Sequence, residues 1–369
     1  MFGKLATILT AGSALPFVDE QALAQMSALN PVPAGGIHIN ANENPLGPCA
    51  EAADAVHSIV KDSGRYMFPL TDALAQTMAE QLGVKYSLNP DESYIHIYAG
   101  SSPALHQSVV AFCAKDRPVV KADPGYEAAE WAAKALGAST VNVPLRDKTF
   151  DHDVKAMLAA APNAGLFYIC NPNNPTGTVT SREDIEYLVA NKPQGSIVMI
   201  DEAYIHFSKS AVPCVDLVAK DKDVIVLRTF SKIYGMAGLR AGAAIARPDL
   251  LAKINEWSLG MMAVTAMTAA QASLQSRTVI AERRKYIGDS RETTFNWLAS
   301  RNVEFIPSET NCFMINVKRN GRDFYKDMAA QNVYIGRAWP VWPNWVRVTV
   351  GTPEEMAKFR DAFAKAYNA

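Results

Sequence analysis

The feature that most constrains the fold is a regular alternation between short apolar runs and amphipathic stretches, from about residue 94 to residue 246. Each run is apolar on both faces, which is typical of strands buried in a parallel sheet. The amphipathic stretches between them are typical of helices that cover such a sheet. The pattern predicts an α/β domain with a mostly parallel sheet and helices on both faces. The predicted strands are Tyr94–Tyr98, Val119–Lys121, Thr140–Val143, Leu166–Cys170, Ile197–Ile200, Val224–Leu227 and Ala241–Ala246.

The pattern changes after Arg247-Pro248. Residues 249–299 are dominated by Ala, Leu, Met and Lys and are expected to form a long helical connector. A large domain over residues 37–248 is therefore predicted to precede this connector, and a small α+β domain over residues 300–369 is predicted to follow it. The elements expected in the small domain are strand Cys312–Val317, helix Gly321–Gln331, strand Val346–Val350 and helix Pro353–Tyr367.

The first residues imitate a secretory signal, with Lys4 before an apolar run and a small-residue sequence at Ala22-Leu23-Ala24. Gly12 and Pro16 interrupt the run, and acidic residues stand before the supposed cleavage point. We therefore expect residues 1–36 to be a retained N-terminal arm in a cytoplasmic protein. A signal remnant and a periplasmic location are the alternative.

Composition excludes several classes of partner. The net charge is −1, so no basic footprint for nucleic acid or an anionic membrane surface is present. The five cysteines and six histidines are dispersed and lack the spacings of a disulfide framework or of a metal site. A small molecule is therefore the expected partner, with no metal.

Four polar segments follow predicted strands. In a parallel sheet the carboxyl ends of strands meet at one edge, where ligands bind. Taken alone, each segment has an ordinary explanation: a capped helix start, a loop, a helix cap and a surface lysine. The helix start, with Ser102 as the predicted cap and Pro103 in the first turn, could also hold a phosphate. The segments are residues 99–106, 171–177, 201–204 and 228–240.

Together these segments resemble the fold-type I pyridoxal-phosphate (PLP) aminotransferases, and most closely the histidinol-phosphate aminotransferase branch. The resemblance runs in the same order over about residues 37 to 355. Its most specific pieces are Asn-Asn-Pro-Thr-Gly at 173–177, Asp-Glu-Ala-Tyr at 201–204, and Ser231-Lys232 followed by Gly-Leu-Arg at 238–240. The run Asn-Ala-Asn-Glu-Asn-Pro-Leu-Gly-Pro at 40–48 is similar to that branch's N-terminal signature.

The resemblance implies catalytic roles for named residues. Lys232 would hold PLP as a Schiff base and then move the Cα proton of the substrate, which requires a neutral amine. Asp201 would pair with the pyridine nitrogen and keep it protonated. Asn174 and Tyr204 would hydrogen-bond the phenolic oxygen of the ring, and Tyr126 would stack on its face.

The resemblance also implies a phosphate anchor and a shared site. Tyr66 matches a tyrosine that reaches the phosphate from the other subunit, so a homodimer with shared active sites is expected. The residues expected to hold the cofactor phosphate within one subunit are Ser101, Ser102, Thr229, Ser231 and Arg240.

The substrates implied are an amino donor and a 2-oxo acid. Spacing alone predicts a solvent-facing Arg347, but in relatives an arginine here binds the substrate carboxylate. Arg337 is the candidate for a donor phosphate, and Asn44 is a further candidate substrate contact. The tryptophans at 339, 342 and 345 and the segment Trp257–Thr265 depart from the branch's pattern. An aromatic or broad-specificity aminotransferase, or another PLP reaction such as a β-lyase or decarboxylase, therefore stays an alternative.

Overall fold

The computed structural model describes residues 33–257 and 260–367. Its centre is a seven-stranded sheet in the order β2-β8-β7-β6-β5-β3-β4. Strand β8 runs antiparallel to both of its neighbours, and the other pairings are parallel. The predicted α/β class is thereby confirmed. The strands are β2 (Ile95–Tyr98), β3 (Val119–Asp123), β4 (Thr140–Pro144), β5 (Leu166–Cys170), β6 (Ile197–Asp201), β7 (Val224–Thr229) and β8 (Gly242–Ala246).

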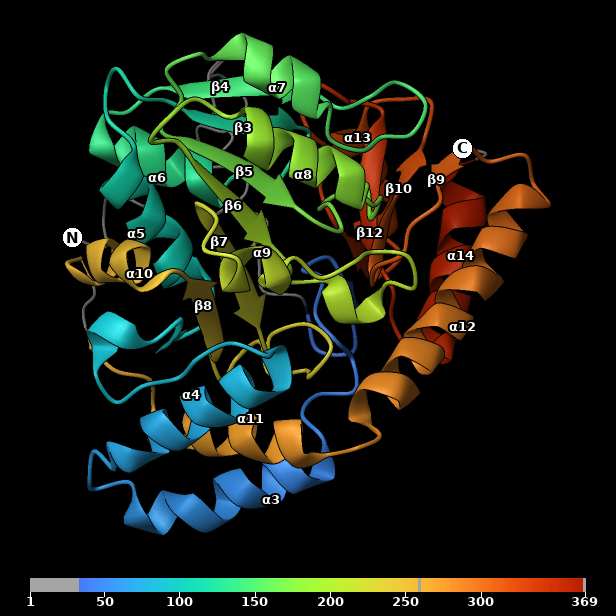
Figure 1. Ribbon diagram of the computed structural model, residues 1–369. Helices are drawn as coiled ribbons and strands as arrows, with labels where there is room; N and C mark the ends of the chain where they lie inside the picture. Colours follow the sequence, from blue (N-terminus) through green and yellow to red (C-terminus); the bar gives the residue numbers. More distant parts are fainter. Residues whose placement is uncertain (1–32, 258–259, 368–369) are drawn as a thin grey trace, which may run out of the picture.

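Helices cover both faces of this sheet (Figure 1). Every residue of β5, β6, β7 and β8 is buried, as expected for strands that are apolar on both faces. The chain moves outward from β3 to β4, and then back across the sheet through β5, β6 and β7. Because such crossovers are right-handed, the helix after β3 and the helices after β4, β5 and β6 lie on opposite faces. These helices are α6 (Ala128–Leu136), α7 (Val154–Ala160), α8 (Arg182–Asn191) and α9 (Val215–Ala219), and α5 (Ser102–Phe112) follows β2.

The reversal of chain direction between β3 and β5 positions the functional site. A reversal of this kind opens a crevice at the carboxyl ends of the strands, because neighbouring connections diverge to opposite faces. The segments that follow β3, β5, β6 and β7 begin at this edge. Polar residues placed there are held by a buried, hydrogen-bonded sheet.

The C-terminal part contains a second, antiparallel sheet in the order β12-β10-β9. The predicted helix and strand positions agree with it to within about two residues. Three short strands were not predicted, because two or three residues carry no readable periodicity; two of them, β1 and β11, pair in parallel. The elements are β1 (Ile37–Ile39), β9 (Phe305–Ile306), β10 (Cys312–Asn316), α13 (Gly321–Ala329), β11 (Val333–Ile335), β12 (Trp345–Thr349) and α14 (Pro353–Tyr367).

The expected long helical connector is three helices rather than one. A break precedes α11, where Gly260 has the left-handed φ of 77° that glycine tolerates. Helix α11 contacts α3 and α4, and α12 runs from it toward the C-terminal sheet (Figure 1). The domain boundaries stay a prediction. The helices are α3 (Ala50–Ile59), α4 (Pro69–Leu82), α10 (Pro248–Asn255), α11 (Val264–Gln275) and α12 (Val279–Ala299), with 3-10 turns η1 (Val60–Asp62), η2 (Pro90–Glu92) and η3 (Ile205–Phe207).

The predicted N-terminal arm falls almost wholly outside the described residues, and the compartment that depends on it stays a prediction. Within residues 33–257 and 260–367, no helix has the length and hydropathy that crossing a bilayer requires. The cysteines at 49, 113, 170, 214 and 312 are all free thiols.

Candidate active site

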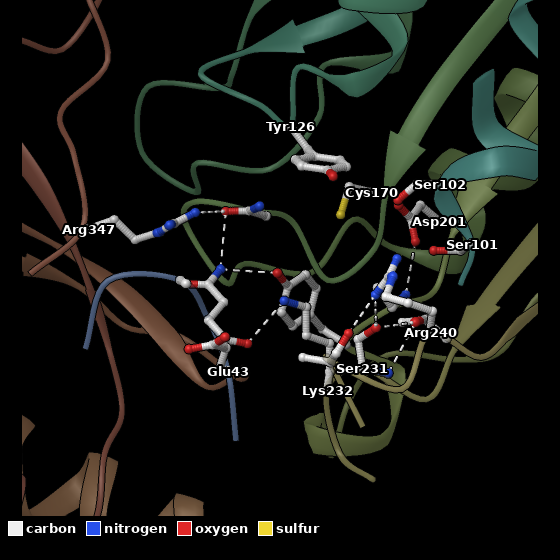
Figure 2. A pocket seen from close by; sticks show the side chains of 17 residues that line it. Glu43, Ser101, Ser102, Tyr126, Cys170, Asp201, Ser231, Lys232, Arg240 and Arg347 are labelled. Carbon is white, nitrogen blue, oxygen red and sulfur yellow. Dashed lines mark hydrogen bonds between the residues drawn. The ribbon is translucent and has the colours of Figure 1, made fainter. Parts of the chain in front are cut away.

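A cavity of about 290 Å³ lies at the carboxyl edge of the large sheet. Segments after β3, β5, β6 and β7 and the start of α5 form most of its wall, and β12 and residues 41–43 complete it (Figure 2). The residues lining it are Ala41, Asn42, Glu43, Ser101, Ser102, Tyr126, Cys170, Asn174, Asp201, Ala203, Tyr204, Thr229, Ser231, Lys232, Ala237, Arg240 and Arg347. The structure therefore brings together the predicted catalytic residues and every predicted cofactor residue except Tyr66.

Asp201 is the last residue of β6 and is 3% exposed. One carboxylate oxygen accepts a hydrogen bond of 2.8 Å from the Tyr168 hydroxyl, and the other accepts one of 3.1 Å from the Ala203 amide. Burial raises the pKa of this carboxyl above its usual value, while these two donors and the charge of Lys232 oppose the rise. A buried acid held at both oxygens has a fixed orientation toward the cavity.

Lys232 follows β7 and enters the same cavity (Figure 2). Its Nζ donates a 3.0 Å hydrogen bond to the carbonyl of Asn42 and lies 5.5 Å from the centre of the Tyr204 ring. Burial, and then the positive charge of Arg347, lower the lysine pKa from 10.5 to about 8. A substantial fraction of this amine is therefore neutral and nucleophilic near neutral pH.

An anion cradle lies on one side of the cavity, where Arg240 meets Ser231 and the first turn of α5 (Figure 2). The Arg240 guanidinium donates to the Ser231 hydroxyl at 3.1 Å. Ser101 is the N-cap of α5, one residue earlier than predicted, and its side chain makes no capping hydrogen bond. The helix N–H groups are thus left to a ligand, and the helix dipole favours an anion there.

Glycines keep this cradle open. Gly100 has a φ of 85°, and a β-carbon there would collide with the Arg240 guanidinium. A β-carbon at Gly242 would lie 2.6 Å from the Ser101 backbone nitrogen. Both positions therefore require glycine for the close approach of backbone and guanidinium.

The opposite side of the cavity is a hydrogen-bond network centred on Asn42. Its side-chain amide donates to the Tyr204 hydroxyl at 3.0 Å and to the Asn174 side-chain oxygen Oδ1 at 3.4 Å. Arg347 donates to the same Asn174 oxygen at 3.0 Å and to the Asn40 carbonyl at 2.7 Å. Its Nε is buried without a hydrogen-bond partner among the described residues. Arg347 therefore presents a positive charge that only neutral groups contact through hydrogen bonds.

Three predicted residues are not brought to the cavity. Asn44 instead donates to the Ile233 carbonyl and accepts from the Leu46 amide, so its side chain links the local turn to the segment that carries Lys232. Arg337 is ion-paired with buried Glu127. Tyr66 is 72% exposed and stacks on exposed Phe68, with ring centres 5.6 Å apart.

The tryptophan-rich loop contributes packing rather than cavity wall. Trp339 is 2% exposed and packs with Ile306 and Met314. Trp342 and Trp345 contact Phe150, with ring centres 5.6 and 6.2 Å from it. The tryptophans by which this loop departs from the branch's pattern therefore pack against residues outside the cavity lining.

Asn42 and Tyr168 are the main site residues that sequence reasoning missed. Asn42 lies within the N-terminal signature, and its left-handed φ of 54° is a conformation that asparagine tolerates. Tyr168 lies in a strand that reads as uniformly apolar, so its hydroxyl gave no separate signal. The alternation of side chains places Tyr168 on the same face of β5 as cavity-lining Cys170.

The residues that line the cavity fit PLP. The cofactor has a phosphate, a ring nitrogen that needs an acid, and an aldehyde that needs a neutral amine. The cradle at Arg240, the buried carboxyl of Asp201 and the low-pKa amine of Lys232 supply one partner for each, around one cavity.

Comparisons with known proteins agree with this arrangement. The family model described as aminotransferase class I and II matches residues 34–363. A histidinol-phosphate aminotransferase of Moorella thermoacetica is 30% identical over 88% of this chain and 83% of its own length. An aromatic amino acid aminotransferase of Cutibacterium acnes is 30% identical over 89% of this chain and 92% of its own length. The crystal structure of histidinol-phosphate aminotransferase from Sinorhizobium meliloti in complex with pyridoxal-5'-phosphate has a TM-score of 0.82 and 25% identity, covering 96% of each chain.

Proposed function

We propose that Lys232 binds the cofactor covalently and moves the proton in each half-reaction, because this chain belongs to the class I and II aminotransferase family. It is a PLP-dependent aminotransferase similar to histidinol-phosphate aminotransferases. The reaction transfers an amino group between an amino donor and a 2-oxo acid. The observation that carries the residue assignment is the placement of the Lys232 amine, with its pKa of about 8, in the same cavity as buried Asp201 and the Arg240 cradle.

When bound, PLP supplies an electron sink for the negative charge that develops at the substrate Cα. The role of Asp201 is to hold a proton on the ring nitrogen, since an anionic carboxylate fixed beside it favours the charged form. The Tyr168 hydroxyl and the Ala203 amide hold both oxygens of this carboxylate and prevent it from turning away.

Lys232 acts as the acid and base once the substrate amine has displaced it. Its neutral amine would accept the substrate Cα proton, and the resulting ammonium would donate a proton later in the same half-reaction. The Asn42 carbonyl, 3.0 Å from Nζ, positions the amine between the two sides of the cavity.

The remaining cavity residues orient the reactants. Asn174 and Tyr204 would hydrogen-bond the ring hydroxyl oxygen, and Tyr126 would stack on the ring; all three line the cavity. Arg347 is placed to bind the α-carboxylate of an amino acid in bidentate fashion, because its Nε has no partner in the described chain. Binding at Arg347 would direct the Cα–H bond toward Lys232.

A donor screen tests this function. Purified holoenzyme is mixed, without keto acid, with histidinol phosphate, aromatic amino acids or aliphatic amino acids, and conversion of bound cofactor to its amine form is followed by absorbance. Stoichiometric conversion that a 2-oxo acid reverses supports transamination. Release of ammonia or carbon dioxide with no amine form would indicate a lyase or a decarboxylase instead.

We further propose a homodimer in which Tyr66 completes the partner's phosphate cradle. Tyr66 and Phe68 are exposed by 72% and 64% and lie side by side, so they form an apolar surface that a second subunit could cover. Mixing Tyr66→Phe protein with Lys232→Ala protein tests sharing. If sites are shared, mixed dimers contain a site that pairs the intact Tyr66 of one subunit with the intact Lys232 of the other, and PLP affinity at that site returns to the wild-type value.

A further inference from the structure

The cationic side chains around the cavity differ in what balances their charge. Among the described residues, the cationic side chains that line the cavity are Lys232, Arg240 and Arg347. Arg240 contacts the Ser231 hydroxyl and the Ala237 carbonyl, and Arg347 contacts only neutral oxygens, so both keep their charge for an anionic ligand. Arg337 stands next to Arg347, whose backbone amide donates to the Arg337 carbonyl at 3.1 Å.

The positive charge of Arg337, unlike that of Arg240 or Arg347, is balanced by a carboxylate of the protein itself. Its guanidinium forms an ion pair with Glu127, whose side chain is 7% exposed. Glu127 is the N-cap residue of α6, yet its side chain makes no capping hydrogen bond and is used for the ion pair instead. Glu127 directly follows Tyr126 and Arg337 pairs with the backbone of Arg347, so each partner is next to a residue that lines the cavity.

Trp339 fixes the geometry of this pair. The Arg337 guanidinium carbon lies 4.1 Å from the centre of the Trp339 ring, and that of Arg347 lies 5.7 Å from it. The indole N–H donates to the Gly125 carbonyl at 3.2 Å, which ties the ring to the loop that carries Glu127. Trp339 is 2% exposed, so Arg337 cannot turn toward the cavity without disturbing a packed core.

We propose that Glu127 is a specificity-determining residue that cancels the positive charge of Arg337 and thereby selects amino acid donors over phosphorylated amines. This inference rests on the proposed aminotransferase function and names its substrate class. The donor is an amino acid whose α-carboxylate binds Arg347 and whose side chain carries no negative charge.

The charge at the cavity mouth supports the same class. Glu43 lines the cavity on the side of Arg347 (Figure 2). Arg347 and Glu43 balance each other, so a single α-carboxylate adds one negative charge to this side and a phosphate dianion adds two. A phosphate dianion would face Glu43 as a like charge, with Arg337 already committed to Glu127.

The test is a donor comparison in wild-type, Glu127→Gln and Glu130→Gln holoenzymes. Glu130 is the matched control, because it lies one turn further along α6 and pairs with Lys121 at 3.2 Å instead of with Arg337. The probes are histidinol phosphate and a panel of aromatic and aliphatic amino acids. We measure kcat and KM separately, and absorbance of bound PLP reports that each variant is folded and loaded.

For the wild type we expect kcat/KM for the best amino acid to exceed that for histidinol phosphate by at least about tenfold. Removing the negative charge of Glu127 in Glu127→Gln should raise kcat/KM for histidinol phosphate at least about tenfold, mainly through KM, because the positive charge of Arg337 is then no longer cancelled and acts on the donor phosphate through space. Amino acid turnover should change less than about threefold in both variants, and Glu130→Gln should not improve the phosphorylated donor.

A wild-type enzyme that prefers histidinol phosphate would overturn this inference and leave the aminotransferase function intact. The same conclusion follows if loaded Glu127→Gln gains nothing with histidinol phosphate. If no donor converts the bound cofactor in any of the three proteins, the proposed function itself fails. The wild-type comparison needs no variant, so the inference stays testable even if Glu127→Gln does not fold.

Discussion

The two sides of the cavity are held in place by different means. The cofactor side, with Asp201, Ser231 and Arg240, is positioned by the ends of consecutive buried strands and by the start of a helix. The substrate side joins Asn42 and Arg347 through side-chain hydrogen bonds between segments 132 to 307 residues apart. Backbone topology therefore positions the residues that we propose for the chemistry, and a side-chain network positions the residue that we propose for binding the donor carboxylate. Changes to the first side should abolish turnover, and changes to the second should alter affinity.

The largest expected effect is that of Lys232→Ala. Removing the amine removes both the covalent attachment and the proton carrier, so kcat should fall by about 10⁴-fold or more. Steady-state assays and the absorbance of bound PLP measure the two losses. Turnover at the wild-type rate would show that the cofactor side has been assigned to the wrong residue.

Asp201→Asn should have the next largest effect. A neutral amide keeps the shape of the site but cannot hold the ring nitrogen protonated, so kcat should fall about 10²-fold or more while PLP still binds. The absorbance of the purified variant verifies occupancy, and rapid mixing with donor measures the rate. An unchanged rate in loaded protein would contradict the role of this carboxylate.

Arg347→Lys probes the substrate side. Lysine keeps the charge but cannot form the paired hydrogen bonds of a guanidinium, so KM for amino acid donors should rise roughly tenfold to a hundredfold. We expect kcat to change far less than in Asp201→Asn. A large loss of kcat with an unchanged KM would erase the distinction between the two sides.

The sequence predicts the cofactor side of the cavity better than the substrate side. The segments after β5, β6 and β7 could be expected to meet because the carboxyl ends of parallel strands lie at one edge, and the resemblance to the family then implied the roles of their residues. Asn42 could not, since its position depends on contacts with Tyr204, Cys312 and Thr349 across the fold.

The sequence alone also could not show whether the charge of an arginine is balanced by a carboxylate in the fold. Arg337 is a plausible phosphate ligand in the sequence, and only the fold places Glu127 against it. The prediction of one long helical region was too coarse, because the segments that separate α10, α11 and α12 are short and contain no proline to mark them.

The smallest expected effect is on pH dependence. Only the neutral amine of Lys232 attacks PLP, so the rate of cofactor capture by apoprotein should rise with pH and level off above about 8, its lowered pKa. Arg347 helps to lower this pKa, so Arg347→Gln should shift the midpoint to higher pH. Stopped-flow absorbance from pH 6 to above pH 11 measures both midpoints. A wild-type midpoint close to 10.5 would mean that burial does not perturb this amine.

The most direct test is to locate the covalent bond. Holoenzyme is reduced with borohydride, digested, and mapped by mass spectrometry. We predict one pyridoxyl-phosphate adduct, on the peptide that contains Lys232, with a stoichiometry near one per chain. An adduct on another lysine, or a protein that remains unlabelled at saturating PLP, would contradict the account.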